Sequence, residues 1–210
     1  MTEFITKGGV LIIPIILCSV LALAIFVERL IHIYRMRKKG RDIEFQVIAL
    51  LQEGREAEAV KIAKASDSPM GRIIEAALEA KDNADRETLE AIIVNGIDTE
   101  VRGLSSNIQI LATIGNIAPL LGLLGTVIGM IKAFMVIQEM GGKVNAAVLA
   151  GGIWEAMLTT AFGLAVALPV MIAHSWLTAS IDKYEARLQN GSVAIIRQLV
   201  QEKGKRTINA

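Results

Sequence analysis

Glu155 is the residue whose type and setting most favour chemistry. It is the only charged residue between Lys143 and Asp182, in a stretch that is otherwise apolar. An ionised carboxylate within hydrocarbon costs on the order of 2.5 to 3.5 kcal/mol, so such a group is expected to face protein or water, and Glu155 is the default functional candidate. If the apolar helix starts near Val148, Glu155 lies about 10 Å in, and a glutamate that only reaches back to the interface is the alternative.

Three hydroxyl groups accompany this carboxylate. At about 100° per helical residue, Thr159 lies 40° from Glu155 and Thr160 lies 140° away. We therefore expect Thr159 to share the face of Glu155 and Thr160 to point elsewhere. Thr126 is the hydroxyl residue within a separate glycine-rich segment, and bonding to a carbonyl of its own helix is the commoner fate of such a threonine.

The glycines around Thr126 have the spacing of a helix-packing surface. Gly115, Gly122 and Gly129 recur every seven residues, and Gly125 forms a GxxxG pattern with Gly129. Small residues let helices approach closely in a membrane, where lipid provides no hydrophobic drive for association. We predict close packing for these four glycines and for Gly163.

These residues require apolar helices to position them, and the chain contains three candidate spans. Gly8–Val27 has 20 consecutive uncharged residues, about 30 Å as a helix, and Gly103–Ile131 has 29. The third span lies between residues 148 and 179. The first run has no basic leader and no small-residue cleavage site, so a removed signal peptide is the weaker alternative. Each span has one proline, at which we expect a helix kink: Pro14, Pro119 and Pro169.

The distribution of basic residues predicts the orientation of the spans. Six Arg and Lys residues follow span one between positions 29 and 41, whereas the link between spans two and three has only Lys143. Basic flanks stay in the cytoplasm. We therefore predict a periplasmic N-terminus, an outer hairpin near Gly141–Gly142 and a cytoplasmic C-terminus.

The charged insert after span one is expected to form amphipathic helices in a small bundle. Breaks are predicted near Gly54 and Ser68–Pro69. A further helix beginning near Asp85 is predicted to run unbroken into span two, because no strong breaker intervenes. An apolar stripe after span three predicts that this helix continues towards Gly204.

Composition excludes several classes of function. The formal net charge is +1 and 53% of the 210 residues are hydrophobic, which favours a membrane protein over a nucleic-acid-binding protein. Cys18 is the only cysteine, so an intrachain disulfide, a zinc site and dithiol chemistry are not expected. With two histidines, classical hydrolase chemistry is not expected either.

Two segments closely resemble the signature stretches of the ExbB/TolQ/MotA family of proton-channel motor subunits. They are Pro119–Phe134, PLLGLLGTVIGMIKAF, and Glu155–Pro169, EAMLTTAFGLAVALP. The three-span layout with a large insert after span one resembles ExbB and TolQ rather than four-span MotA.

This resemblance implies an all-α integral membrane protein with three transmembrane helices, long helices projecting into the cytoplasm and a homo-oligomeric, pentameric pore. It divides the chain into an N-terminal tail with the first span (1–34), a cytoplasmic helical insert (35–102), a channel domain (103–181) and a cytoplasmic C-terminal helix (182–210). The protein would be a bacterial inner-membrane motor subunit that converts proton motive force into work for outer-membrane transport.

The resemblance also implies an ion path and partners. It maps the pore-facing threonines to Thr126 and Thr160 and the motif glutamate to Glu155. Two copies of a single-span partner similar to ExbD or TolR would occupy the pore, with a transducer similar to TonB or TolA, and no nucleic acid or cofactor is implied. The transported ion would be H⁺. However, the Thr159–Thr160 pair resembles sodium-driven stators, so Na⁺ at Thr126, Thr159 and Thr160 is an alternative.

Other functions remain open at this stage. TolQ-type envelope maintenance and gliding machinery would use the same kind of motor. A passive oligomeric scaffold would use the glycine surface without ion flow. An intramembrane enzyme using Glu155 and His174 is disfavoured, because the two residues are about 28 Å apart along one helix.

Overall fold

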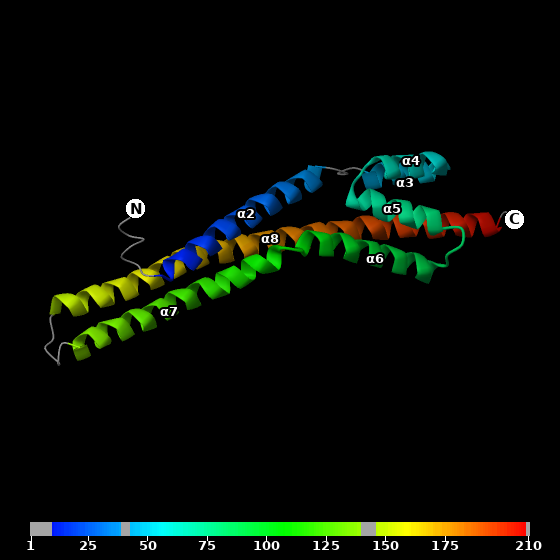
Figure 1. The fold of residues 1–210 in the computed structure, drawn as a ribbon. Helices are drawn as coiled ribbons and strands as arrows, with labels where there is room; N and C mark the ends of the chain where they lie inside the picture. The colour runs from blue at the N-terminus through cyan, green and yellow to red at the C-terminus, as the bar shows by residue number, and fades with distance from the viewer. Residues whose placement is uncertain (1–9, 39–42, 140–145, 209–210) are drawn as a thin grey trace. The chain divides into compact units, whose positions relative to one another are not determined.

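The computed structural model describes residues 10–38, 43–139 and 146–208, and within these ranges every regular element is an α-helix (Figure 1). The helices are α2 (Ile12–Lys38), α3 (Ile43–Gln52), α4 (Glu56–Ala65), α5 (Pro69–Ala80), α6 (Arg86–Ser105), α7 (Ile108–Glu139) and α8 (Ala146–Ile208). By length and composition, α2, α7 and α8 could each cross a membrane. The predicted all-α class with three spans is confirmed.

Contacts within the chain form two compact units. The span unit contains the described residues up to Glu28 together with Asn107–Leu177, and the bundle unit contains Arg29–Ser106 together with the described residues from Thr178 onward. Helices α2 and α8 contribute residues to both. The predicted hairpin at Gly141–Gly142 lies outside the described residues.

The prolines occupy different positions in their helices. Pro14 is in the first turn of α2, where a missing N–H costs no intrahelical hydrogen bond. Pro119 and Pro169 lie inside α7 and α8, so each leaves the carbonyl four residues earlier without its helical donor.

Helix α6 does not run unbroken into α7, and the prediction of one continuous helix is wrong. Ser106 leaves helical geometry with φ −57° and ψ −117°. The buried Arg29 guanidinium donates to the carbonyls of Gly103 and Leu104 at 3.2 and 3.3 Å and to the Ser106 hydroxyl at 3.2 Å. The last carbonyls of a helix lack intrahelical donors, so a cation from α2 stabilises an end here that no local breaker predicts.

The helices of the bundle unit begin and end close to where the sequence predicts. Gly54, with φ +73°, adopts the left-handed conformation between α3 and α4. The Ser68 hydroxyl accepts a hydrogen bond from the Gly71 amide at 3.0 Å and caps α5, which has Pro69 in its first turn. Asp85 caps α6 in the same way through the Thr88 amide at 2.9 Å.

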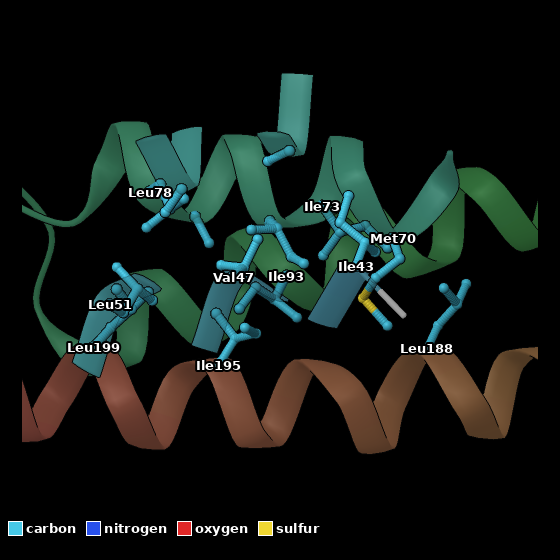
Figure 2. Packing of buried hydrophobic residues seen from close by; sticks show 14 of the residues in the cluster. Ile43, Val47, Leu51, Met70, Ile73, Leu78, Ile93, Leu188, Ile195 and Leu199 are labelled. Carbon is cyan, nitrogen blue, oxygen red and sulfur yellow. The ribbon is translucent and has the colours of Figure 1, made fainter. Parts of the chain in front are cut away.

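One apolar core holds the bundle unit together. Ile43, Val47 and Leu51 of α3 face α8, with α5 and α6 completing the cluster (Figure 2). On α8 the apolar stripe contributes Leu188, Ile195 and Leu199, all at most 4% exposed. The predicted continuation of the third span as an amphipathic helix is confirmed, and the insert and this helix share one bundle.

Candidate functional site

Helices α7 and α8 lie side by side in the span unit, in contact through their glycines (Figure 1). A Cβ added to Gly125 would lie 2.6 Å from the Thr159 Cβ, and one added to Gly163 would lie 2.6 Å from the Ala118 carbonyl oxygen. Real Cβ atoms do not approach other atoms so closely. Only glycine permits this helix separation.

The other three glycines predicted for packing lie on the same contact. A Cβ on Gly115 would be 2.9 Å from Met171 Cγ, one on Gly122 would be 3.0 Å from Thr160 Cα, and one on Gly129 would be 2.9 Å from Ala156 Cβ. Sequence reasoning did not single out Gly152, whose Cβ would lie 2.7 Å from that of Ala133. The small-residue surface therefore extends further along α8 than predicted.

Thr160 makes a hydrogen bond between the two helices. Its hydroxyl donates to the Gly122 carbonyl of α7 over 2.9 Å. Helical spacing predicts that Thr160 points away from the face of Glu155, yet both Thr159 and Thr160 contact α7. At a glycine contact the helices are close enough for two consecutive positions to face the same neighbour.

Thr159 and Thr126 bond within their own helices. Thr159, 2% exposed, donates to the Glu155 carbonyl at 2.7 Å and packs on Gly125. Thr126, half-buried, donates to the Leu123 carbonyl at 2.7 Å, the alternative considered for it above. Each hydroxyl oxygen still has lone pairs that can accept a proton donor or contact a cation.

Glu155 has a cationic neighbour that sequence reasoning missed. Its Oε1 lies 3.8 Å from Lys132 Nζ on α7, and the two side chains are 33% and 56% exposed. The pairing follows from antiparallel register. In two antiparallel helices, the residue numbers of every contacting pair have about the same mean. That mean is close to 142 for Gly125–Thr159 and Gly129–Ala156, and also for Lys132–Glu155. Lys132 was identifiable as the charge that ends the second apolar run.

A cavity of about 150 Å³ adjoins this ion pair. Its lining includes Lys132, Glu155 and Thr159, with Gly125 and Gly129 on the α7 side. Water occupies about 30 Å³ per molecule in the liquid, so the cavity can hold several waters next to charged and hydroxyl groups. Such a place can keep a carboxylate solvated inside an otherwise apolar unit.

Metal-ligating side chains do not gather near these groups in the part of the chain that the structure describes. Within residues 10–38, 43–139 and 146–208 there is no cluster of three or more His, Cys, Asp or Glu side chains that could hold a metal ion. What the arrangement offers is a carboxylate, an ammonium group and three hydroxyls along a helix contact. These groups can bind or pass a small cation.

Comparison with known proteins identifies the family. Residues 65–190 match the sequence model of the MotA/TolQ/ExbB proton channel family. The match covers α7 and the part of α8 that carries Glu155, Thr159 and Thr160. The chain belongs to this family. With three candidate spans, it is a multi-pass membrane protein.

Individual family members align over most of their length. An ExbB homolog of Methanothermobacter thermautotrophicus is 31% identical over 95% of this chain and 72% of its own. The biopolymer transport protein exbB1 of Vibrio cholerae is 28% identical over 87% of this chain and 81% of its own. The biopolymer transport protein ExbB of Neisseria meningitidis is 31% identical, over 77% and 78%.

Proposed function

We propose that this MotA/TolQ/ExbB family member is the channel-forming subunit of an inner-membrane motor that uses proton motive force to energise outer-membrane transport, as an ExbB-type protein. Family membership and the biopolymer transport proteins among its relatives support this proposal. One structural observation carries it. The Thr160 hydroxyl bonds to the Gly122 carbonyl across the α7–α8 contact, and a cavity lined by Glu155 and Thr159 adjoins that contact.

The role of these groups in ion transfer follows from solvation. A carboxylate that cycles between protonated and ionised forms in an apolar setting needs nearby hydroxyls and water to stabilise the ionised form. Thr160, Thr159 and Thr126 supply hydroxyls, and Glu155 supplies a charge close to Lys132. The proton-cycling carboxylate itself would come from an ExbD-like or TolR-like partner.

The assembly that we propose is a pentamer around two copies of that single-span partner, coupled to a TonB-like transducer. Its N-terminus would be periplasmic and its C-terminus cytoplasmic, because Arg and Lys concentrate after the first span. Large apolar side chains exposed on all three spanning helices, Leu17, Leu120 and Leu168 among them at 61% or more, provide surface for lipid and for neighbouring subunits. A TolA-linked or gliding motor would use the same subunit.

The ion that we propose is H⁺. Hard oxygen ligands favour Na⁺ as well, and Thr159 and Thr160 provide two hydroxyls at adjacent positions, so a sodium-driven version is the alternative. Replacing Na⁺ by K⁺ in an ion-flux assay separates the two. Unchanged flux would exclude the sodium-driven version.

Thr160→Val tests the proposal most directly. Valine keeps the shape of threonine and deletes the hydroxyl, so we expect an intact assembly that has lost proton flux and proton-dependent work. Thr113→Val is the matched control, because Thr113 is an exposed α7 threonine that bonds to the Gln109 carbonyl of its own helix. Wild-type flux in Thr160→Val would contradict the proposed role of Thr160 and favour the scaffold alternative.

A further inference from the structure

Each helix of the α7–α8 contact carries one isolated charge in its apolar part. On α7 the only Asp, Glu, Lys or Arg between residues 108 and 138 is Lys132, and on α8 the only one between residues 146 and 181 is Glu155. A charge within a spanning helix is costly and is expected to pair or to serve an ion path. These two side chains meet, with 3.8 Å between Lys132 Nζ and Glu155 Oε1. The ion path proposed above gives Lys132 no role of its own.

This pair supplies all the formal charge around the cavity of about 150 Å³ beside it. The lining contains one ammonium, one carboxylate and the Thr159 hydroxyl, and its other residues are glycine or aliphatic. The formal charge of the lining is therefore zero. A carboxylate on its own would attract a cation into the cavity, whereas an ammonium fixed beside it repels a second cation.

The pair precedes the threonines on a path that enters from the linked ends of α7 and α8. Glu155 lies four residues before Thr159 on α8, which is about 6 Å of helix. On α7, Lys132 lies ten residues after Gly122, whose carbonyl accepts the Thr160 hydrogen bond. Because the two helices are antiparallel, both intervals run towards the linked ends. A cation that moves from there towards Thr160 therefore meets the ammonium first.

A sodium ion would need the same oxygen atoms that lie beside the ammonium. Hard cations bind through several oxygen ligands, and the cavity offers the Glu155 carboxylate and the Thr159 hydroxyl oxygen. Na⁺ bound to that carboxylate would lie close to Lys132 Nζ, and two positive charges so close repel strongly where water is scarce. Lys132 thus neutralises the carboxylate that Na⁺ requires.

A proton does not meet the same obstacle. The carboxylate, the ammonium and the Thr159 hydroxyl exchange protons, and so does water, for which the cavity has room. A proton can therefore enter this chain at one group while another proton leaves from its neighbour. The charge of the Lys132–Glu155 pair is the same before and after such a transfer, because as many protons leave as enter. A metal ion cannot be passed on in this way.

We propose that Lys132 is a specificity-determining residue of the ion path, whose ammonium excludes Na⁺ from the Glu155 carboxylate while protons pass. This inference rests on the motor function proposed above and names the ion that this site admits. It differs from a packing role, in which the pair only holds α7 against α8. In a packing role, loss of the ammonium would change stability and leave the preference between ions unaltered.

Binding of radiolabelled Na⁺ to the purified assembly tests the proposal without depending on ion flux. Lys132→Met replaces the ammonium by an uncharged side chain of similar length, so we expect Na⁺ to bind at least about tenfold more tightly than to the unmodified protein. Lys132→Arg keeps the positive charge and should bind Na⁺ as weakly as the unmodified protein does. Lys183→Met is the matched control, because Lys183 is an exposed α8 lysine outside the cavity lining. Equal Na⁺ affinity in the unmodified protein and in Lys132→Met would overturn the proposal.

A double variant identifies the group that the ammonium neutralises. When Glu155→Gln is added to Lys132→Met, the carboxylate is lost, so the gained Na⁺ affinity should be lost with it. Tight Na⁺ binding that survives in the double variant would place the ion elsewhere and overturn the proposal.

Flux in reconstituted vesicles separates this inference from the motor function. Lys132→Met should raise the ratio of Na⁺ flux to H⁺ flux about tenfold, and an unchanged ratio would contradict the role of Lys132. If Lys132→Met gained Na⁺ binding but neither it nor the unmodified protein carried any ion, the motor function would fail while the exclusion of Na⁺ by Lys132 would be supported.

Discussion

At the scale of single residues, the α7–α8 contact distinguishes three threonines that look alike in the sequence. Thr126 and Thr159 donate to carbonyls of their own helices, and Thr160 donates across to Gly122. Glu155 lies beside Lys132 and is one-third exposed, so its carboxylate is neither deeply buried nor free of an electrostatic neighbour. Thr160 therefore links the two helices, whereas Thr126 and Thr159 bond within their own helices and Glu155 pairs with a cation.

Glu155→Gln separates the charge of Glu155 from its size. If the carboxylate assists ion transfer, we expect reduced flux with a changed dependence on pH, because glutamine neither titrates nor balances the Lys132 ammonium. The measurement is proton flux across a pH series in reconstituted vesicles, with Glu139→Gln as a control at the end of α7. A normal pH profile would make Glu155 structural and leave the proton to the partner's carboxylate alone.

At the scale of elements, glycine positions set the separation of α7 and α8. The contact is antiparallel, and small residues on each helix meet backbone or small side chains on the other. Without a hydrophobic drive in lipid, this close packing supplies the helix association. Before α7 begins, Arg29 stabilises the end of α6 through the carbonyls of Gly103 and Leu104.

Gly163→Val tests the contribution of this close approach. The new Cβ would lie 2.6 Å from the Ala118 carbonyl oxygen, a backbone atom that cannot move aside alone. We expect a loss of about 1 to 3 kcal/mol or more from overpacking, seen as a lower midpoint of thermal unfolding in detergent. Gly151→Val is the matched control on the same helix, since no atom lies within 4 Å of its added Cβ. Equal midpoints for the two variants would contradict the packing role.

At the scale of the whole molecule, the chain forms two units that share helices α2 and α8. The bundle unit buries a continuous apolar core and therefore has its own basis for stability (Figure 2). The span unit leaves many large apolar side chains exposed on α2, α7 and α8. Such a surface requires lipid or further protein around it.

Native mass spectrometry of the tagged chain, gently extracted from its own host, measures what surrounds the span unit. We expect five copies of this chain with two copies of a small single-span protein. That stoichiometry would support the motor assembly and provide the partner for flux assays. A complex containing this chain alone, also after milder extraction, would favour the scaffold alternative.

The sequence by itself determined the family, the three apolar helices, the breaks near Gly54 and Ser68, and the apolar stripe of the C-terminal helix. These features depend on local composition and on periodicity, and both are properties of short stretches of the sequence. The packing glycines of α7 belong here too, because their spacing is a property of one helix.

The tertiary structure alone decided the features that join distant residues. The end of α6 depends on Arg29, 74 residues from the carbonyl of Gly103. The direction of the Thr160 hydroxyl depends on how closely Gly122 allows the helices to approach, which a wheel drawn for one helix does not contain. The Lys132–Glu155 pair arises in the same way, since its geometry comes from which helices pack together and in which register.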